Sequence, residues 1–99
     1  MAQFDVYTRR GGPGYLLDYQ ADVLNQLVTR FVVPLLPRSI APAIIGRLNP
    51  IFMIGGDDMV LMPQNAATVL ARELDRRVLS LDDQRYVISN AMDFLMGGY

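Results

Sequence analysis

The last twenty residues of the chain, SLDDQRYVISNAMDFLMGGY, constrain the fold most, because they are typical of a helix with more apolar surface than one small domain covers. Ser80 can cap such a helix, and Asp82 and Asp83 place negative charge in its first turn, where the helix dipole favours anions. Gly97 and Gly98 can end it, since glycine readily adopts the left-handed conformation that follows many helices.

The apolar side chains of this helix spread over roughly 200° of its circumference, whereas a helix lying on one core needs about 100°. They are Val87, Ile88, Ala91, Met92, Phe94, Leu95 and Met96. We therefore expect one edge of this apolar stripe to cover the helix's own domain and the other edge to meet a second surface. The alternative is a helix buried deep within its own domain.

The length and composition indicate one globular domain, residues 1–99. The chain is 52% apolar and only 19% charged, and this surplus of apolar side chains favours self-association. The sequence contains no cysteine, no apolar run long enough to span a membrane and no N-terminal signal layout. We therefore expect a cytoplasmic protein without a membrane partner.

The charges argue against catalysis and against a direct nucleic-acid partner. All nine basic residues are arginine and the formal net charge is −1, whereas nucleic-acid-binding proteins usually carry a net basic surface. The absence of histidine removes the commonest general base and metal ligand. The carboxylate pairs Asp57-Asp58 and Asp82-Asp83 fit a turn and the first turn of a helix. We therefore expect a protein that is not an enzyme and that holds no metal or other cofactor.

Alternating apolar residues predict a first strand over residues 3–8, a glycine-rich turn over 9–14 and a returning strand over 15–20. Arg9 and Arg10 lie at the tip of this hairpin, which is either simply solvated or a docking site for an acidic peptide. Residues 31–37 are apolar in both phases, which predicts a strand buried on both faces with an edge or a bulge at Pro34.

Residues 50–62 predict a second hairpin with its turn at residues 55–58.

Three other segments are harder to interpret. Residues 21–28 fit a short helix, a loop or a bulged strand, and Val23 and Leu24 would form a contact patch there if exposed.

In the connector over residues 38–47, the isoleucines at positions 40, 44 and 45 are expected to close one end of a barrel. Residues 66–79 favour a helix by propensity, although one or two short strands fit them equally well. Short strands followed by one helix predict a small barrel or sandwich with a C-terminal helix.

Residues spread along the whole chain match, in order and spacing, the pattern of a known protein family. They are Gln3, Phe4, Val6, Tyr7, Thr8, Gln20, Asp22, Arg30, Val33, Pro34, Leu35, Arg47, Leu48, Pro50, Ile54, Gly55, Met62, Ser80 or Leu81, Ile88, Asn90 and Ala91. In order, spacing and total length this set resembles the CcdB family, the toxins of plasmid-type toxin–antitoxin modules that poison DNA gyrase.

The resemblance implies a mainly β fold, an SH3-like small antiparallel barrel that ends in a C-terminal α-helix. It therefore favours strands over a helix for residues 66–79. It also implies a homodimer that binds the A subunit of DNA gyrase and is neutralised by a cognate, partly disordered antitoxin. In the family the dimer and target faces both lie at the C-terminal helix, which would account for the wide apolar stripe.

The resemblance also gives the expected contact residues, most of them near the end of the chain. Gyrase contacts are expected at Val23, Leu24, Asn90, Asp93, Met96, Gly97, Gly98 and Tyr99. Antitoxin contacts are expected at Arg9, Arg10, Gly11, Val23 and Leu24, and dimer contacts at Met92, Leu95 and Met96. The family has a tryptophan in place of Gly97, an isoleucine in place of Tyr99 and an asparagine in place of Asp93, whereas Asn90 and Gly98 are retained.

Three functions are compatible with these residues. The resemblance favours a gyrase-poisoning toxin. The missing tryptophan favours a CcdB-like dimeric binding protein that is not toxic or has another target. An RNA endonuclease is the third possibility, because MazF-type toxins share this fold class, but the absence of histidine and lysine and the acidic balance argue against it.

Overall fold

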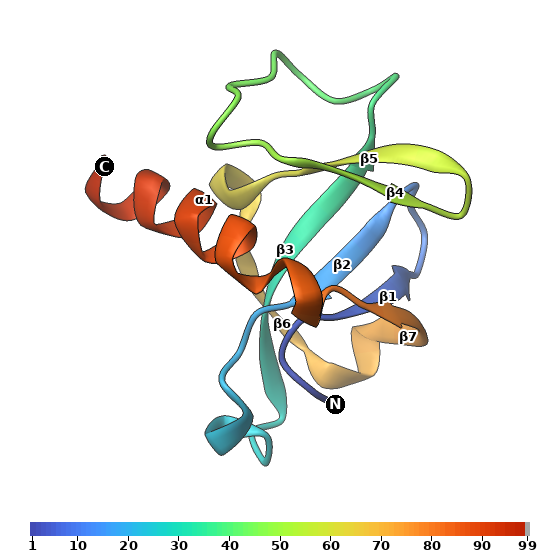
Figure 1. Cartoon of the computed structure of the whole chain (residues 1–99). Coiled ribbons are helices and arrows are strands. Elements are labelled where there is room, and N and C mark those ends of the chain that lie inside the picture. Colours follow the sequence, from blue (N-terminus) through green and yellow to red (C-terminus); the bar gives the residue numbers. More distant parts are fainter. Residues whose placement is uncertain (99) are drawn as a thin grey trace.

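A single sheet of antiparallel strands curls around one side of the molecule, and a C-terminal helix covers its hollow (Figure 1). The computed structural model describes residues 1–98, and within them the sheet has seven strands. These are β1 (Asp5–Arg9), β2 (Tyr15–Asp18), β3 (Thr29–Pro37), β4 (Ile51–Ile54), β5 (Asp57–Leu61), β6 (Ala67–Leu70) and β7 (Leu74–Ser80). The helix is α1 (Arg85–Gly97), and short 3-10 turns lie at Asp22–Leu24, Pro63–Asn65, Ala71–Glu73 and Asp82–Gln84. The expected small antiparallel barrel with a C-terminal helix is confirmed in the form of a half barrel.

The long strand β3 holds the sheet together, because it pairs with three other strands. Along one edge it pairs with β2, and along the other it pairs first with β6 and then with β5. Pro34, which has no N–H to donate, lies between the stretch that pairs with β6 and the stretch that pairs with β5. Its carbonyl accepts a hydrogen bond from the Met62 N–H at 2.9 Å. The expected interruption at Pro34 is therefore a change of partner strand.

Residues 66–79 form strands, as the family resemblance implies and as helix propensity alone does not. β6 pairs with β3, and β7 pairs with β1, so the sheet satisfies the backbone of this segment. Leu74 is buried against Tyr7, Leu16 and Val32. Tertiary pairing and this burial outweigh the helix propensity of the local sequence.

The main core lies between the concave face of the sheet and α1. It contains Val6, Leu17, Val33 and Leu35 from the sheet, and Ile88, Ala91 and Met92 from the helix. A second, smaller cluster on the other face joins β1, β2, β3 and β7 through Tyr7, Leu16, Val32 and Leu74. Both faces of the central strands are therefore apolar, which explains the continuous apolar run in the sequence of β3.

The helix begins four residues later than the sequence suggests, because its N-cap residue is Gln84 and not Ser80. Ser80 ends β7, and its hydroxyl oxygen accepts the Asp82 N–H at 3.1 Å, but the N-cap residue of the 3-10 turn before α1 is Leu81. On α1 the buried residues Ile88, Ala91 and Met92 form the middle of the apolar stripe. Val87, Leu95 and Met96 flank this middle and are exposed, so the deeply buried alternative is wrong. In Figure 1 the C-terminal half of α1 projects beyond the sheet.

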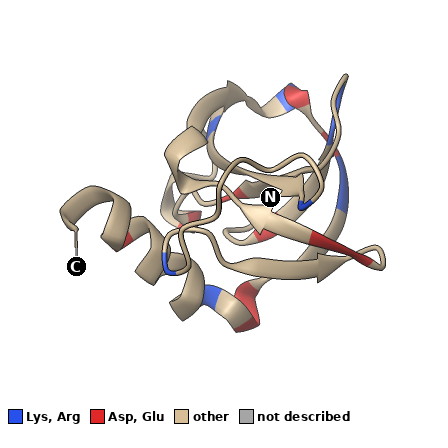
Figure 2. Ribbon diagram, turned by 90° about the horizontal axis from the view of Figure 1, so that it is seen from above, with Lys and Arg blue, Asp and Glu red and all other residues tan. Residues whose placement is uncertain are grey.

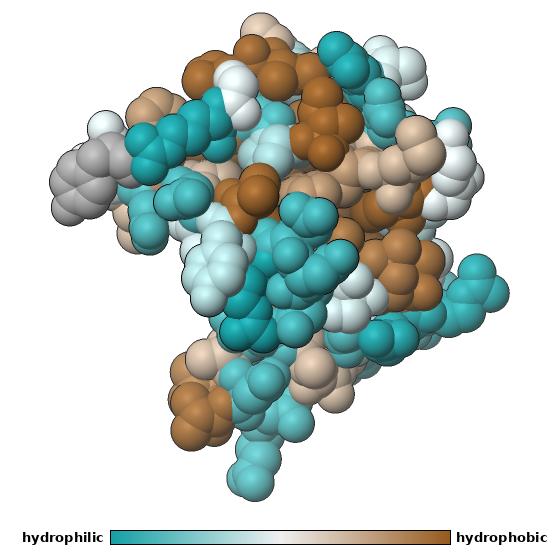
Figure 3. All heavy atoms as spheres, in the orientation of Figure 1, coloured by the Kyte–Doolittle hydropathy of each residue, from teal (hydrophilic) through white to brown (hydrophobic). Residues whose placement is uncertain are grey.

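The connector between β3 and β4 does not close the end of a barrel. Ile40, Ile44 and Ile45 are exposed, so that prediction was wrong. Buried Asn49 anchors this connector, because its side-chain oxygen accepts the Ile45 N–H at 3.0 Å and its amide donates to the Leu61 carbonyl at 3.0 Å. Leu48 supplies the buried apolar contact. Figure 3 shows apolar surface gathered over this connector at the top of the view.

Candidate protein-binding surfaces

The solvent-facing side of α1 brings together most of the expected gyrase contacts. Asn90, Asp93 and Gly97 are exposed and lie three and four residues apart, so they form one stripe along the helix. Gly97 is the last helical residue, and Gly98 follows in the left-handed conformation with φ 78°. The Gly98 N–H donates to the Phe94 carbonyl at 2.9 Å, which closes the helix. The expected contact at Tyr99 lies outside the described residues.

Exposed apolar side chains border this stripe. Met96 is 81% exposed, and Leu95 is also exposed, so both are accessible to a second copy of the chain. Met92, the third residue expected at a dimer interface, is only 7% exposed and packs into the main core. The Arg47 guanidinium lies 5.2 Å from the centre of the Phe94 ring and covers part of the helix flank.

A second surface is the loop of residues 21–28, which joins β2 to β3. Every residue in it is exposed, and Val23 is 88% exposed. The loop contains one 3-10 turn, so the loop interpretation of this segment is the correct one. Sequence reasoning selected Val23 and Leu24 but missed Leu27 and Val28, which are equally uncovered. The available signal was four apolar residues at helical spacing in a segment too short and too polar for a clear helix prediction.

The structure does not bring this loop to the helix end within one chain. In Figure 1 the loop projects at the bottom of the molecule, and the C-terminal end of α1 projects at the left. The expected gyrase contacts at Val23 and Leu24 therefore lie on a different projection from those on α1.

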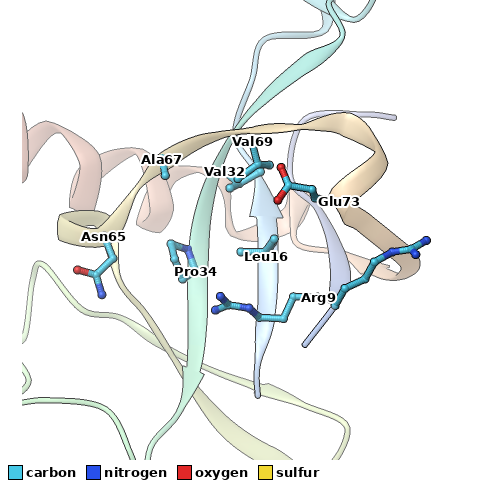
Figure 4. A pocket seen from close by; sticks show the side chains of 9 residues that line it. Arg9, Leu16, Val32, Pro34, Asn65, Ala67, Val69 and Glu73 are labelled. Carbon is cyan, nitrogen blue, oxygen red and sulfur yellow. The ribbon is translucent and has the colours of Figure 1, made fainter. Parts of the chain in front are cut away.

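A pocket of about 390 Å³ lies beside the tip of the β1–β2 hairpin (Figure 4). Leu16, Val32, Pro34 and Val69 supply its apolar lining, and its polar lining comes from Arg9, Arg10, Asn65 and Glu73. In Figure 4 Leu16 lies between Arg9 and Glu73. The Arg10 guanidinium lies 3.5 Å from the Asp75 carboxylate in an exposed ion pair, which contributes little stability. Gly11, the third expected antitoxin contact in this hairpin, is exposed with φ 73°.

A buried polar cluster lies on the same side of the sheet as this pocket. The Asp18 and Arg30 side chains are both fully buried and form an ion pair, with Arg30 Nη2 at 2.5 Å and Nε at 3.0 Å from Asp18 Oδ2. Burial raises the pKa of the Asp18 carboxyl above its ordinary value, while the hydrogen bonds from Arg30 and Gln20 oppose this shift. Burial, followed by the nearby charges of Asp5 and Asp18, also raises the pKa of the Tyr7 phenol.

One carboxylate of each acidic pair in the sequence has an arginine partner in the structure. Asp58 forms an ion pair with Arg38 at 3.7 Å, and Asp82 pairs with Arg85 across one turn. Figure 2 shows acidic and basic positions interspersed around the described part of the chain. Among residues 1–98, no group of three histidine, cysteine or acidic residues could hold a metal ion. Over the same residues, no helix has the length and hydropathy needed to cross a membrane.

Known proteins share this half barrel with its single C-terminal helix. One solved structure is an endoribonuclease in complex with its cognate antitoxin from a Mycobacterial species, with a TM-score of 0.79 and 14% identity over 98% of this chain and 95% of that chain. Another is an endoribonuclease from a Mycobacterial species, with a TM-score of 0.77 and 15% identity over 98% of this chain and 91% of that one. At these identities the likeness shows the fold alone.

A match of the sequence to a family model identifies the family. The family model described as CcdB protein matches residues 3–98, and the chain therefore belongs to the CcdB family. Membership supports a toxin of a toxin–antitoxin module as the class of protein, and the surfaces above bear on what it binds.

Proposed function

We propose that this chain is a toxin of a toxin–antitoxin module that acts in the cytoplasm as a homodimer, binds the A subunit of DNA gyrase without catalysing a reaction of its own, and is neutralised by a cognate antitoxin. The observation that carries this proposal is the C-terminal half of α1, which presents exposed apolar side chains beside a polar stripe and ends at Gly97. The family match over residues 3–98 supports a toxin of a toxin–antitoxin module as the class of protein.

The gyrase-binding face in this proposal is the exposed stripe of Asn90, Asp93 and Gly97 with Met96 beside it. A separate gyrase contact is the loop of residues 21–28 with Val23 and Leu24, which the antitoxin would also cover. A methionine adapts its shape to different partners, which suits a recognition surface. Gly98 leaves the helix end free of side-chain bulk, so a partner can approach the last turn closely. Gly97 and Asp93 replace a tryptophan and an asparagine of the family, which favours the alternative function of a CcdB-like dimer with no toxicity or another target.

The dimer contact in this proposal comes from Leu95 and Met96. Fully burying one such side chain contributes about 1.5–3 kcal/mol, so a two-fold contact that covers Leu95 and one side of Met96 in each protomer is favourable, and it leaves the other side of Met96 open to the target. Met92 supports the contact from within the core, because it fixes the position of the same helix face.

The antitoxin contact in this proposal is the pocket beside the β1–β2 hairpin together with Val23 and Leu24 in the loop. The apolar lining of the pocket suits an apolar side chain, and Arg9 and Arg10 suit a neighbouring carboxylate. A disordered, acidic antitoxin segment that folds as it binds would satisfy both requirements.

Expression of the chain in growing bacteria tests this function. Expression should arrest growth, and a gyrase A-subunit mutation should relieve the arrest. Met96→Glu should abolish it, whereas Met53→Glu should not, because Met53 is comparably exposed (71% against 81%) but lies on β4. Unimpaired growth would favour the retargeted alternative. Arrest that persists in the gyrase mutant and is accompanied by cleaved RNA would instead favour an endoribonuclease.

A further inference from the structure

We infer that Gln20 and Arg30 are positioning residues that hold the loop of residues 21–28 as a preformed binding surface, which places Val23 and Leu24 before the partner has bound. That partner is the gyrase A subunit, and its identity rests on the proposed function, whereas the rigidity of the loop does not.

The loop needs specific contacts to stay exposed, because half of its side chains are large and apolar, which favours their burial. Four of its eight side chains are large and apolar, and all four are exposed: Val23, Leu24, Leu27 and Val28. A loose segment of this kind would fold back and bury its apolar side chains, since burial of apolar surface is favourable. Polar groups of the barrel hold it outward instead.

The Gln20 side chain links the loop to β3 through two hydrogen bonds. Its side-chain oxygen accepts the Phe31 N–H at 3.0 Å, and its side-chain amide donates to the Leu24 carbonyl at 2.9 Å. The same residue is itself fixed, because its backbone N–H donates to Asp18 Oδ1 at 3.1 Å. These hydrogen bonds therefore connect the middle of the loop to a central strand.

Arg30 forms the second restraint, from the buried polar cluster on the pocket side of the sheet. Its Nε and Nη2 atoms are used by the buried Asp18 carboxylate, which fixes the guanidinium plane. The remaining nitrogen, Nη1, lies 3.3 Å from the Asn25 side-chain oxygen and 3.5 Å from its carbonyl oxygen. A buried charge in a fixed orientation thus contacts the loop residue that follows Leu24.

The two ends of the loop are also tied to the barrel. The Gln3 N–H donates to Asp22 Oδ1 at 2.7 Å, and the Ala71 N–H donates to the Val28 carbonyl at 2.8 Å. The loop is therefore fixed at Asp22, Leu24, Asn25 and Val28. A surface that is ordered before binding avoids the entropic cost of ordering it in the complex.

The variant Gln20→Glu tests this role with little change in shape. The carboxylate can still accept the Phe31 N–H, but it has no proton to donate to the Leu24 carbonyl. Gln26→Glu is the matched control, because it adds the same charge to the same loop at a residue outside these restraints. We expect amide hydrogen exchange to accelerate at residues 21–28 in Gln20→Glu alone, while the β3 amides stay protected and the melting temperature stays close to that of the wild type.

Binding gives the second readout. In titrations with a gyrase A-subunit fragment, Gln20→Glu should bind about three- to tenfold more weakly than wild type, and Gln26→Glu should bind within twofold of it. Equal loop exchange in both variants would overturn the inference, as would faster exchange with unchanged affinity. If the wild type does not bind the fragment, the proposed target fails, and the exchange measurement alone then decides whether the loop is held as described.

Discussion

Restoring a tryptophan at the end of α1 tests how much of the family's target surface this chain retains. Gly97 is the last residue of the helix and is exposed, and its backbone is right-handed, unlike that of Gly98 at φ 78°. The substitution Gly97→Trp therefore meets no backbone strain, and it places an indole on the stripe that also carries Asn90 and Asp93.

The expected gain follows from the energy of aromatic anchors. Such residues at the centre of an interface contribute about 2–4 kcal/mol, which corresponds to roughly a 30- to 900-fold change in dissociation constant. Replacing a helical glycine also stabilises the helix by about 0.5–1 kcal/mol, but this term affects folding and not the contact. Gly97→Ala is the control, because it has the helix gain without the indole.

Calorimetric titration with a gyrase A-subunit fragment measures the effect. Gly97→Trp should bind at least tenfold more tightly than Gly97→Ala, and both variants should melt at a similar, slightly raised temperature. Equal affinity of the two variants would refute the reasoning, because it would mean that the rest of the α1 surface no longer fits this target.

Three further predictions concern the fold. Gly14→Ala should destabilise the protein by about 2–4 kcal/mol in urea unfolding, because its φ is 84° and an added Cβ would lie 2.1 Å from the Leu35 carbonyl oxygen. Arg30→Met should cost about 3–5 kcal/mol by leaving a buried carboxylate unpaired, and adding Asp18→Leu should recover most of this loss; a double variant as unstable as the single one would contradict the ion-pair explanation. Burial raises the pKa of Tyr7, so the folded state resists its ionisation and stability should fall as the pH rises above about 10; Tyr7→Phe should fall less steeply in alkaline denaturation.

The local sequence predicted a strand well where apolar and polar residues alternate along it, or where glycines mark the turn beside it. The two hairpins follow from glycine positions, and Gly11, Gly14, Gly55 and Gly56 all have positive φ. The second turn was predicted over residues 55–58 but is shorter, because Asp57 and Asp58 begin β5. The exposed flank of α1 was also predictable, because a wide apolar stripe cannot lie on one core.

Other features depend on contacts between distant residues and leave no local signal. The strands over residues 66–79 required pairing with β1 and β3, against their own propensity. The isoleucines of the β3–β4 connector are exposed because Asn49 and Leu48, and not the isoleucines, anchor that segment.

The pocket and the buried ion pair were missed for the same reason. The pocket lining comes from β1, β2, β3 and the segment over residues 65–73, and only the fold brings these together. Asp18 and Arg30 are twelve residues apart in sequence, and nothing local distinguishes them from surface charges.

The central claim is that α1 presents more apolar surface than its own barrel covers, and that a second copy of the chain covers part of it. Static light scattering at micromolar concentration tests this claim most directly. It should give twice the 11.1 kDa mass of one chain for the wild type, and a lower mass for Met96→Glu but not for Met53→Glu. A wild-type mass of one chain at that concentration would contradict the account.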